Sequence, residues 1–323
     1  MTNHWVDLRY SDVFLIIGSN AAENHPISFK WITDAIEQRG AKLISVDPRF
    51  TRTSARAHIY APLRPGTDVA FMGGMINYIL QNDLIQKEYV KNYTNATCLI
   101  NENFDFKTAE GIFSGYDPEK RVYDPSSWAY QLDENKVPKR DMSMQDPHCV
   151  YQLLKKFYAR YDMETVSKIT GTPIDLMKQV YETYSSTHAA DKSATIMYAM
   201  GTTQHTHGTQ NIRSYVIAQL LMGNIGVAGG GINALRGESN VQGSTDMCLL
   251  FHIIPGYLQC PTDADTSLEV FIKKYYEGKN FDPDSLAWWS NGRKYMVSLL
   301  KEWYGEHADR KSTRLNSSHR IRS

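Results

Sequence analysis

The sequence predicts an α/β protein, with a doubly wound, mostly parallel sheet followed by a partial second lobe. Apolar runs at 13–18 and 42–46 have the continuous hydrophobicity of strands buried on both faces of a parallel sheet. The segment between them has the length of a helix, so the three form a strand–helix–strand unit. A third apolar run, at 192–200, is again followed by a polar loop and a helical segment. This alternation is the layout of mononucleotide-binding folds.

Length and composition narrow the function classes. With 323 residues the chain can build about two domains around a large core. Lys and Arg together number 35, as do Asp and Glu, so a zero formal net charge offers no attraction to nucleic acid or to an anionic membrane. No apolar run approaches the roughly 20 residues of a membrane span. The first residues contain no apolar signal-peptide core, so we expect a soluble globular chain.

The four cysteines do not predict a metal site. Cys98, Cys149, Cys248 and Cys260 form no CxxC pair, and none has a histidine at metal-ligand spacing. We therefore expect no metal site and no iron–sulfur cluster held by this chain alone. Buried or free thiols are the default in a chain of this size.

Polar side chains follow the first strand directly. They lie beyond its carboxyl end, where open α/β sheets bind ligands: Ser19, Asn20, Glu23 and His25. Pro26 suits the first turn of a helix over 27–38, and Gly40 suits its end. The N-terminus of that helix favours a phosphate. The sequence therefore predicts a ligand-binding loop between the first strand and this helix.

Asp47 ends the second strand, at the usual place for a carboxylate that accepts from a ribose or a base. The first loop lacks the GxGxxG pattern, so the standard NAD fingerprint is absent. Asn20, Glu23 and Asp47 therefore have two interpretations: they contact a ligand, or they only cap helices and turn the chain. We favour ligand binding because strand, loop, helix and carboxylate coincide.

The composition changes in the middle of the chain. The elements expected before this change are a short strand at 57–61, a helix at 69–80 that Thr67 or Asp68 could cap, and a helix at 84–93. From about 94 to 147 the chain is rich in Asn, Asp, Lys and Tyr, which predicts a surface insertion of hairpins and loops. We expect its aromatic residues to form a small core of their own: Tyr116, Tyr123, Trp128 and Tyr130.

A second unit repeats the order of the first. The helices expected before it are at 150–161, 163–170 and, from Thr172-Pro173, to about 185. The strand at 192–200 ends at Gly201, and a loop with an amide and histidines leads to a helix at 212–222. We expect this loop and the first one to face a ligand at the same edge of one sheet. His205 and His207 lack a third partner in sequence, which favours polar loop residues over metal ligands.

A glycine-rich stretch at 226–243 contains one arginine, Arg236, followed by Asn240 and Gln242. Dense glycines let a backbone approach a ligand closely. The planar fork of arginine N–H donors suits a small anion. A flexible surface loop with a solvated arginine is the alternative interpretation.

The chain divides into three parts. We expect an α/β domain at 1–237 that carries the insertion at about 94–147, and the start of a second, incomplete α/β lobe at 238–310. The last segment, 311–323, is basic, serine-rich and nearly devoid of apolar residues, which predicts a disordered or non-native tail.

These motifs together resemble the large subunit of molybdopterin-dependent formate dehydrogenases, and the formate dehydrogenase-N type in particular. The resemblance is carried, in family order, by MTNHWVD, GSNAAENHP, AKLISVDPRFTRTSA, APLRPGTDVAF, YTNA, GYDPEKRVYD, YQLDEN, GTTQH, QNIR and GNIGVAGGGINALRGESNVQG. It runs from Met1 to about Gly305. Nitrate reductases and other enzymes of the wider group resemble this set less fully and are the alternative within enzymes.

The resemblance implies molybdenum or tungsten held by two molybdopterin guanine dinucleotides, beside a 4Fe–4S cluster in the full-length parent. The cofactor contacts that it implies in the first half are Gly18, Ser19, Asn20, Glu23, Asn24, Asp47, Pro48, Arg49, Thr51, Gly66 and Asp68. Those that it implies further on are Met200, Gly201, Gln204, Asn240 and Gln242. Arg236 corresponds to the arginine that orients formate. Glu238 stands where some relatives carry glutamine.

The resemblance also implies what accompanies this chain. Formate dehydrogenases need a selenocysteine or cysteine metal ligand followed by histidine, and four N-terminal cysteines, none of which this sequence contains. We therefore expect an internal fragment that is inactive alone, from an enzyme that oxidises formate to carbon dioxide. The implied partners are formate, an iron–sulfur electron-transfer subunit and a membrane cytochrome subunit, without nucleic acid or direct membrane insertion. The implied location is the periplasm, at the membrane through partner subunits, with the cytoplasm as the alternative.

Overall fold

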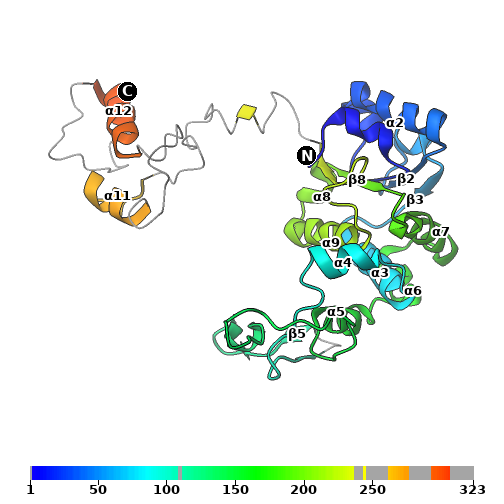
Figure 1. Ribbon diagram of the computed structural model, residues 1–323. Helices are drawn as coiled ribbons and strands as arrows, with labels where there is room; N and C mark the ends of the chain where they lie inside the picture. The colour runs from blue at the N-terminus through cyan, green and yellow to red at the C-terminus, as the bar shows by residue number, and fades with distance from the viewer. Residues whose placement is uncertain (1, 108–110, 236–242, 245–260, 276–291, 306–323) are drawn as a thin grey trace. The chain divides into compact units, whose positions relative to one another are not determined.

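A computed structural model describes most of the chain (Figure 1). The described residues are 2–107, 111–235, 243–244, 261–275 and 292–305. The chain divides into two compact units, Met1–Leu235 and Arg236–Ser323. The residues of 311–323, for which a tail is predicted, lie outside the described ranges.

The centre of the first unit is a five-stranded parallel sheet. Its strands are β1 (Val13–Ile17), β2 (Lys42–Val46), β3 (Ile59–Ala61), β8 (Ala194–Tyr198) and β9 (Ile232–Ala234). They lie in the order β3-β2-β1-β8-β9. The order therefore reverses between β1 and β8, and this reversal is the switch point at which open α/β sheets bind ligands. The predicted doubly wound, mostly parallel α/β fold is confirmed.

The five strands end in one row. Ile17 pairs with Val46 on one side and with Tyr198 on the other, and the pairing continues outward to Ala61 and to Ala234. The residues that follow the strands therefore emerge side by side at the same edge of the sheet. This register brings loops that are far apart in sequence to one place.

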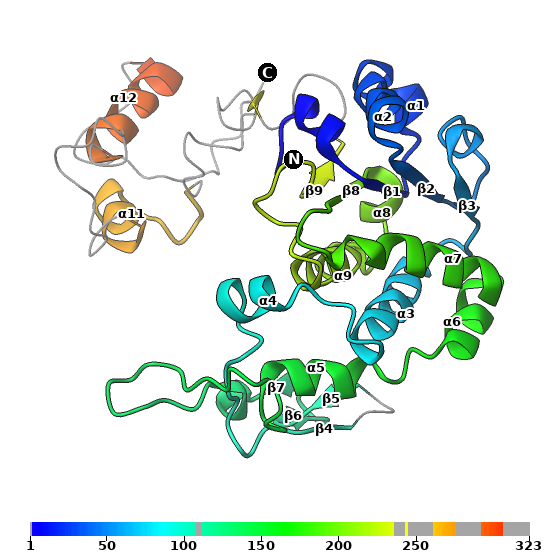
Figure 2. The same ribbon diagram turned by 45° about the vertical axis from the view of Figure 1, so that its right-hand side comes forward.

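Both faces of the sheet are covered (Figures 1 and 2). One face carries η1 (Trp5–Tyr10) and α2 (Pro26–Arg39), and the other carries α3 (Asp68–Gln81), α7 (Ile174–Ser185) and α9 (Gly208–Leu221). Phe14 and Ile16 point into the first core, and Leu15 and Ile17 into the second, because successive side chains of a strand alternate. Two buried faces explain the unbroken apolar run of β1.

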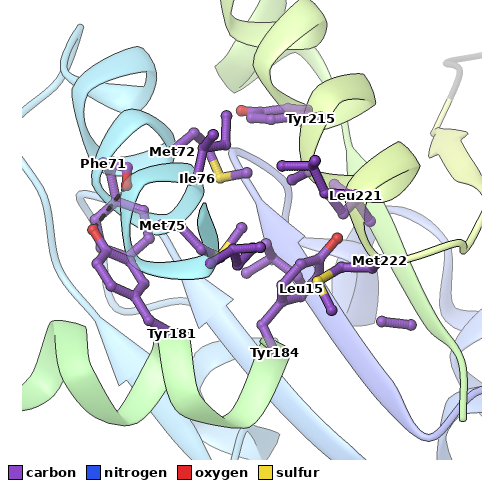
Figure 3. Close-up of a cluster of buried hydrophobic side chains, with 14 of the residues drawn as sticks. Leu15, Phe71, Met72, Met75, Ile76, Tyr181, Tyr184, Tyr215, Leu221 and Met222 are labelled. Carbon is purple, nitrogen blue, oxygen red and sulfur yellow. Dashed lines mark hydrogen bonds between the residues drawn. The ribbon is translucent and has the colours of Figure 1, made fainter. Parts of the chain in front are cut away.

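Buried tyrosines join the helices of the larger core (Figure 3). The hydroxyl of Tyr181 donates to the carbonyl oxygen of Phe71 at 2.8 Å, and the hydroxyl of Tyr184 donates to Gln219 Oε1 at 2.6 Å. A buried hydroxyl without a partner costs about 1–3 kcal/mol. These bonds therefore let tyrosines fill an apolar core between α3, α7 and α9.

Gln219 fastens α9 to the sheet. Its side-chain nitrogen donates to the carbonyl oxygens of Ala194 at 2.9 Å and Gly231 at 2.5 Å, while its oxygen accepts from Tyr184. Asn224 accepts from the backbone nitrogen of Ala194 at 3.1 Å. One fully buried amide thus connects α7, α9, the start of β8 and the residue before β9.

Shorter elements complete the first unit. They are α1 (Ala21–Asn24), η2 (Ser54–Arg56), α4 (Lys87–Tyr93), α5 (Val150–Tyr158), α6 (Met163–Thr170), η4 (Ser186–His188) and α8 (Met200–Thr203). The helices and strands expected from the sequence are present, with shifted boundaries. α9 begins at Gly208 rather than at 212, and β9 lies in the glycine-rich stretch where no strand was expected. Thr67 occupies the N-cap position of α3, but its side chain makes no capping bond, because its hydroxyl donates to the carbonyl oxygen of Arg64 at 2.7 Å.

The insertion consists of hairpins and loops, as expected. Its elements are β4 (Phe106–Lys107), β5 (Ile112–Phe113), β6 (Tyr116–Asp117), β7 (Val122–Tyr123) and η3 (Pro125–Trp128). Both views show them beside α5 and away from the sheet (Figures 1 and 2). The ring of Tyr123 lies 5.2 Å from that of Trp128 and 5.0 Å from that of Tyr116. Tyr130 instead accepts a hydrogen bond from Asn95 and is 37% exposed.

The second unit contains two described helices, α11 (Leu268–Tyr275) and α12 (Gly292–Tyr304). Its buried apolar cluster consists of Leu268, Phe271, Met296 and Leu300. The sequence at 286–304 also predicts a helix-like segment. It is helical from Gly292 onward, and 286–291 lies outside the described residues. Over the described parts of the chain, no helix combines the length and apolar character that crossing a bilayer requires.

Replacing Gln219 tests the buried amide. Gln219→Leu keeps a side chain of similar size but leaves the Tyr184 hydroxyl without its acceptor, so we expect the free energy of unfolding in urea to fall by about 2 kcal/mol. Gln210→Leu on the exposed side of the same helix is the matched control and should change it by about 0.5 kcal/mol or less. Equal effects of the two substitutions would contradict the role of Gln219.

Candidate functional site

The loops that follow β1 and β8 touch at the switch point. A Cβ atom at Gly18 would lie 2.7 Å from the backbone nitrogen of Thr202, and one at Gly201 would lie 2.6 Å from the carbonyl oxygen of Gly18. Real Cβ atoms essentially never come this close. Gly18 also has a φ of +59°, which favours glycine. The expected shared edge of the two loops is therefore present.

Thr202 holds this contact together. Its hydroxyl lies 3.3 Å from the carbonyl oxygen of Ile17 and 3.0 Å from the hydroxyl of Tyr215. Thr202 and Tyr215 are fully buried. The floor of the switch point is therefore a packed polar contact between β1, α8 and α9.

Asn20 joins the first loop to the loop after β2. Its side-chain oxygen accepts from the backbone nitrogen of Thr53 at 3.2 Å and from the hydroxyl of Thr53 at 3.1 Å. Its nitrogen donates to Glu23 Oε2 at 2.6 Å. Asn24 Oδ1 lies 2.5 Å from His25 Nδ1. Asn20, Glu23 and Asn24 thus shape the loop through their own contacts, whether or not they also touch a ligand.

The loop after β2 presents Asp47 at the edge. Asp47 is half-buried, and its Oδ1 accepts from the backbone nitrogen of Arg49 at 2.9 Å. Burial raises the pKa of Asp47 above its ordinary value, while the hydrogen bond and charge of Arg49 oppose the rise. Pro48 and Arg49 are exposed. Thr51 turns inward, with its hydroxyl 3.1 Å from that of Ser54.

Asp68 is a buried carboxylate at the first residue of α3. It is 4% exposed, and its Oδ2 lies 3.5 Å from His205 Nδ1. Burial is the main cause that raises the pKa of Asp68, and the nearby charge of Asp47 raises it further. Its own backbone N–H and the charges of His205 and His207 lower the pKa. Among the described residues, no Lys or Arg forms an ion pair with this carboxylate, and His205 is the side chain within ion-pair distance of it.

The loop that carries Gly66 and Asp68 is anchored to α6. The guanidinium of Arg64 donates to the carbonyl oxygens of Lys168 at 2.5 Å and Ile169 at 2.9 Å, at the end of α6. Gly66 then turns the chain with a φ of +80°. These contacts fix where α3 begins, and with it the position of Asp68.

Three buried polar atoms near the switch point have no partner among the described residues. They are Ser19 Oγ, His207 Nε2 and Asn211 Oδ1. Ser19 follows β1, while His207 and Asn211 belong to the loop and helix after β8. Native proteins rarely leave such atoms unpaired. Their presence at the ligand-binding edge of the sheet fits a polar ligand.

The second loop presents further polar groups. Met200, which is 44% exposed, begins the short helix α8, and the exposed Gln204 is its C-cap. His205 was not among the predicted cofactor contacts, although it is the residue of this loop that reaches Asp68. Only the fold could identify it, because Asp68 lies more than a hundred residues away in sequence.

Three glycines of the glycine-rich stretch, Gly229, Gly230 and Gly231, pack against protein rather than line a ligand site. A Cβ atom at Gly231 would collide with the side chains of Thr2 and Asn3, and one at Gly230 with the carbonyl oxygen of Asn224. The backbone nitrogen of Thr2 donates to the carbonyl oxygen of Ile232 at 3.1 Å. Close approach is therefore needed here, but to the N-terminal segment. Arg236, Asn240 and Gln242 lie outside the described residues.

A basic groove lies between α2 and the η2 segment. It has a volume of about 490 Å³ and is lined by Ala22, Pro26, Phe29, Lys30, Thr33, Arg52, Ala55 and Arg56. None of the predicted cofactor contacts lines it. Arg52 lies 4.0 Å from Glu23, a weak and exposed pair. Within the described ranges, no three His, Cys, Asp or Glu side chains are grouped to hold a metal ion.

Residues 1–259 match the family described as molybdopterin oxidoreductase. The chain is 55% identical to formate dehydrogenase subunit alpha of Megalodesulfovibrio gigas over 94% of its length, and 50% identical to formate dehydrogenase 2 subunit alpha (cytochrome c-553) of Nitratidesulfovibrio vulgaris over 95%. It is 48% identical over 97% to the nitrate-inducible formate dehydrogenase major subunit of Escherichia coli. The chain spans 30% of the length of each of these relatives. The resemblance found in the sequence motifs is confirmed.

One solved structure similar to this chain is acetylene hydratase from Pelobacter acetylenicus. The two are 24% identical with a TM-score of 0.45, and the similarity covers 70% of this chain and 24% of that chain.

Gly201→Ala tests the contact between the two loops. The added methyl group collides with the carbonyl oxygen of Gly18, so we expect the free energy of unfolding in urea to fall by about 1–3 kcal/mol. Gln204→Ala, at an exposed position of the same loop, serves as the control and should be nearly neutral. An unchanged free energy of unfolding in Gly201→Ala would mean that the two loops can move apart without loss of stability.

Asp68→Asn tests the cost of the buried carboxylate. Because burial raises the pKa of Asp68, this group stabilises the fold below its unfolded pKa, and that contribution is lost as pH rises through the folded pKa. We expect the variant to unfold at higher urea than the native chain at pH 7, with the gain disappearing at acid pH. Asp175→Asn, exposed in the first turn of α7, controls for loss of charge at a helix start. A destabilised Asp68→Asn chain at pH 7 would show that His205 outweighs burial.

Proposed function

The chain belongs to the molybdopterin oxidoreductase family, and from this premise we propose that it is the nucleotide-binding core of a formate dehydrogenase catalytic subunit. The observation that carries the proposal is the high identity to formate dehydrogenase alpha subunits over nearly the whole chain. The complete enzyme oxidises formate to carbon dioxide, and this chain binds and positions the cofactor. Because the chain spans under a third of these relatives, formate turnover is proposed for the complete enzyme and not for the chain alone.

The described residues fit the guanine dinucleotide part of a molybdopterin cofactor. The carboxylates of Asp47 and Asp68 can accept from the N–H groups of a base or the hydroxyls of a ribose. Burial raises the pKa of both groups, and donors of this kind would stabilise their charged forms. The unpaired atoms of Ser19 and Asn211 add a hydroxyl and an amide oxygen at the same edge. The close contact of Gly18 with the second loop leaves backbone rather than side chains at the switch point. The site therefore offers more acceptors than the protein itself satisfies.

Other residues hold or shape this site. The remaining proposed cofactor contacts are Asn20, Glu23, Asn24, Pro48, Arg49, Thr51, Gly66, Met200, Gly201, Gln204, Asn240 and Gln242. When bound, the molybdenum or tungsten centre of a bis-molybdopterin guanine dinucleotide supplies the two-electron redox chemistry. The protein contributes position and electrostatics around it. The cysteines of the described ranges are Cys98, within the insertion, and Cys149, directly after it, and both are buried. We therefore assign a 4Fe–4S cluster to the complete enzyme.

Arg236 is proposed to bind formate. A guanidinium presents two parallel N–H donors to a carboxylate, which neutralises the anion and fixes its orientation. The basis for this assignment is the sequence motif NALRGESNVQG, which lies largely outside the described residues. Glu238, two residues further, would place a negative charge near the same anion. No role is assigned to Glu238.

Partners and location follow from the relatives. One relative is named with cytochrome c-553, which supports transfer of electrons from the complete enzyme to a partner protein. We propose an iron–sulfur electron-transfer subunit and a membrane cytochrome subunit as partners. The proposed location is the periplasmic side of the membrane, reached through those subunits.

Arg236→Ala in the complete enzyme that contains this chain tests the assignment. We expect kcat/KM for formate to fall by about 100-fold or more, because the substrate loses both its counter-charge and its orientation. Arg236→Lys should retain part of the activity since it keeps the charge without the fork. Arg213→Ala, exposed on α9, is the control and should be close to the native enzyme. Unchanged formate oxidation would exclude Arg236, and an enzyme that reduces nitrate but ignores formate would favour the alternative.

A further inference from the structure

The contact between His205 and Asp68 suggests a role for a histidine to which no function is assigned above. We propose that His205 is a positioning residue, which keeps the Asp68 carboxylate charged and turned toward a ligand that offers N–H donors, such as a guanine base. The identity of that ligand rests on the function proposed above. The coupling between the two side chains is a property of the protein and stands on its own geometry.

His205 Nδ1 has two neighbours that compete for it. Asp68 Oδ2 lies 3.5 Å away, and Asn211 Nδ2 lies 3.2 Å away. A protonated Nδ1 can donate to the carboxylate but cannot accept from the amide, and an unprotonated Nδ1 can only accept. The proton on Nδ1 therefore decides whether His205 bonds to Asp68 or to Asn211.

The side-chain amide of Asn211 is held so that it cannot turn over when His205 changes its protonation. Its side-chain nitrogen also donates to the carbonyl oxygen of Thr202 at 3.1 Å, and the residue is fully buried. Turning the amide over would place its oxygen against that carbonyl oxygen, with no hydrogen between two acceptors. The amide therefore keeps its nitrogen toward His205, and the imidazole changes its hydrogen bond when Nδ1 loses its proton.

Asp68 needs such a partner. It is almost completely buried, and a buried carboxylate without donors shifts toward its protonated form. A protonated carboxyl group has one acceptor oxygen fewer for the N–H groups of a base. A charged imidazole beside it opposes that protonation, so His205 preserves the acceptor that the ligand uses.

The charged and titratable groups around Asp68 come from several elements. His205 and His207 face it from the loop before α9, Asp47 from the loop after β2, and Tyr215 from α9. The two histidines favour the charged carboxylate, and Asp47 disfavours it. Of the two histidines, His205 has the contact within ion-pair distance. Its removal should therefore affect Asp68 more than removal of His207.

The coupling can be measured in the ligand-free 323-residue chain by following the carboxyl carbon of Asp68 with NMR during a pH titration. We expect the pKa of Asp68 to rise by about one unit in His205→Gln, because an opposite charge at this distance is lost. His207→Gln should raise it less, and His188→Gln, whose ring contacts the carbonyl oxygen of Ser185 instead, should leave it unchanged. His205→Lys should restore a low value, which a merely structural role would not predict. An Asp68 pKa that is the same in the native chain and in His205→Gln overturns the proposal.

A second substitution protects this test against a variant that does not fold. His205→Asn also removes the imidazole charge, so the pKa of Asp68 should rise in this variant as it does in His205→Gln. If the pKa of Asp68 is unchanged in both variants, the two groups are not coupled and the proposal fails.

Ligand binding separates this inference from the proposed function. GDP serves as the probe, and its affinity for the chain is measured by calorimetry from about pH 4 to 8. We expect GDP to bind more weakly in acid. The pH below which binding weakens should be higher in His205→Gln, and binding should be lost in Asp68→Asn. If GDP binding weakens at the same pH in His205→Gln and in the native chain, the role of His205 is overturned but guanine binding stands. Absence of GDP binding at every pH overturns the guanine ligand, and the titrations then decide the coupling by themselves.

Discussion

Between the loops that follow β1 and β8 there is no room for a side chain, because Gly18 and Gly201 bring their backbones together at the switch point of the sheet. Other features of the site depend on this contact. It lets the hydroxyl of Thr202 reach the end of β1, and Thr202 in turn holds the amide of Asn211 through its carbonyl oxygen. The second loop is therefore fixed against the first, and the polar groups of both face one edge.

The same edge combines burial with unmet hydrogen-bonding capacity. Asp68 is almost completely buried, although few donors face its carboxylate. Burial of this kind costs stability. Ser19 and Asn211 each bury a polar atom that has no partner among the described residues. Elsewhere in the described part of the first unit, buried side-chain polar atoms have partners, as the Tyr184–Gln219 bond and the contacts of Asn224 show. Local cost of this kind is typical of a binding site.

Closely packed glycines have different structural roles in this chain. Glycine permits close approach to whatever lies opposite. For Gly230 and Gly231 the neighbours are Asn224 and the first residues of the chain, so those glycines seat the N-terminal segment beside β9. For Gly18 and Gly201 the neighbour is another loop of the site. Sequence alone cannot distinguish these cases because it does not say which backbone lies opposite.

Local sequence determined most of the elements. The unbroken apolar runs at β1, β2 and β8 required burial on both faces, and Pro26, Gly40 and Thr172-Pro173 marked helix ends by their restricted or permissive backbones. Family motifs identified the loops and the carboxylates Asp47 and Asp68. Tertiary structure decided the rest: β9 is a strand only because it pairs with β8, and His205 meets Asp68 only because the sheet order sets the loop after β8 beside the start of α3. Pairing and contact between distant segments depend on the whole chain, whereas helix ends and buried strands follow from the residues themselves.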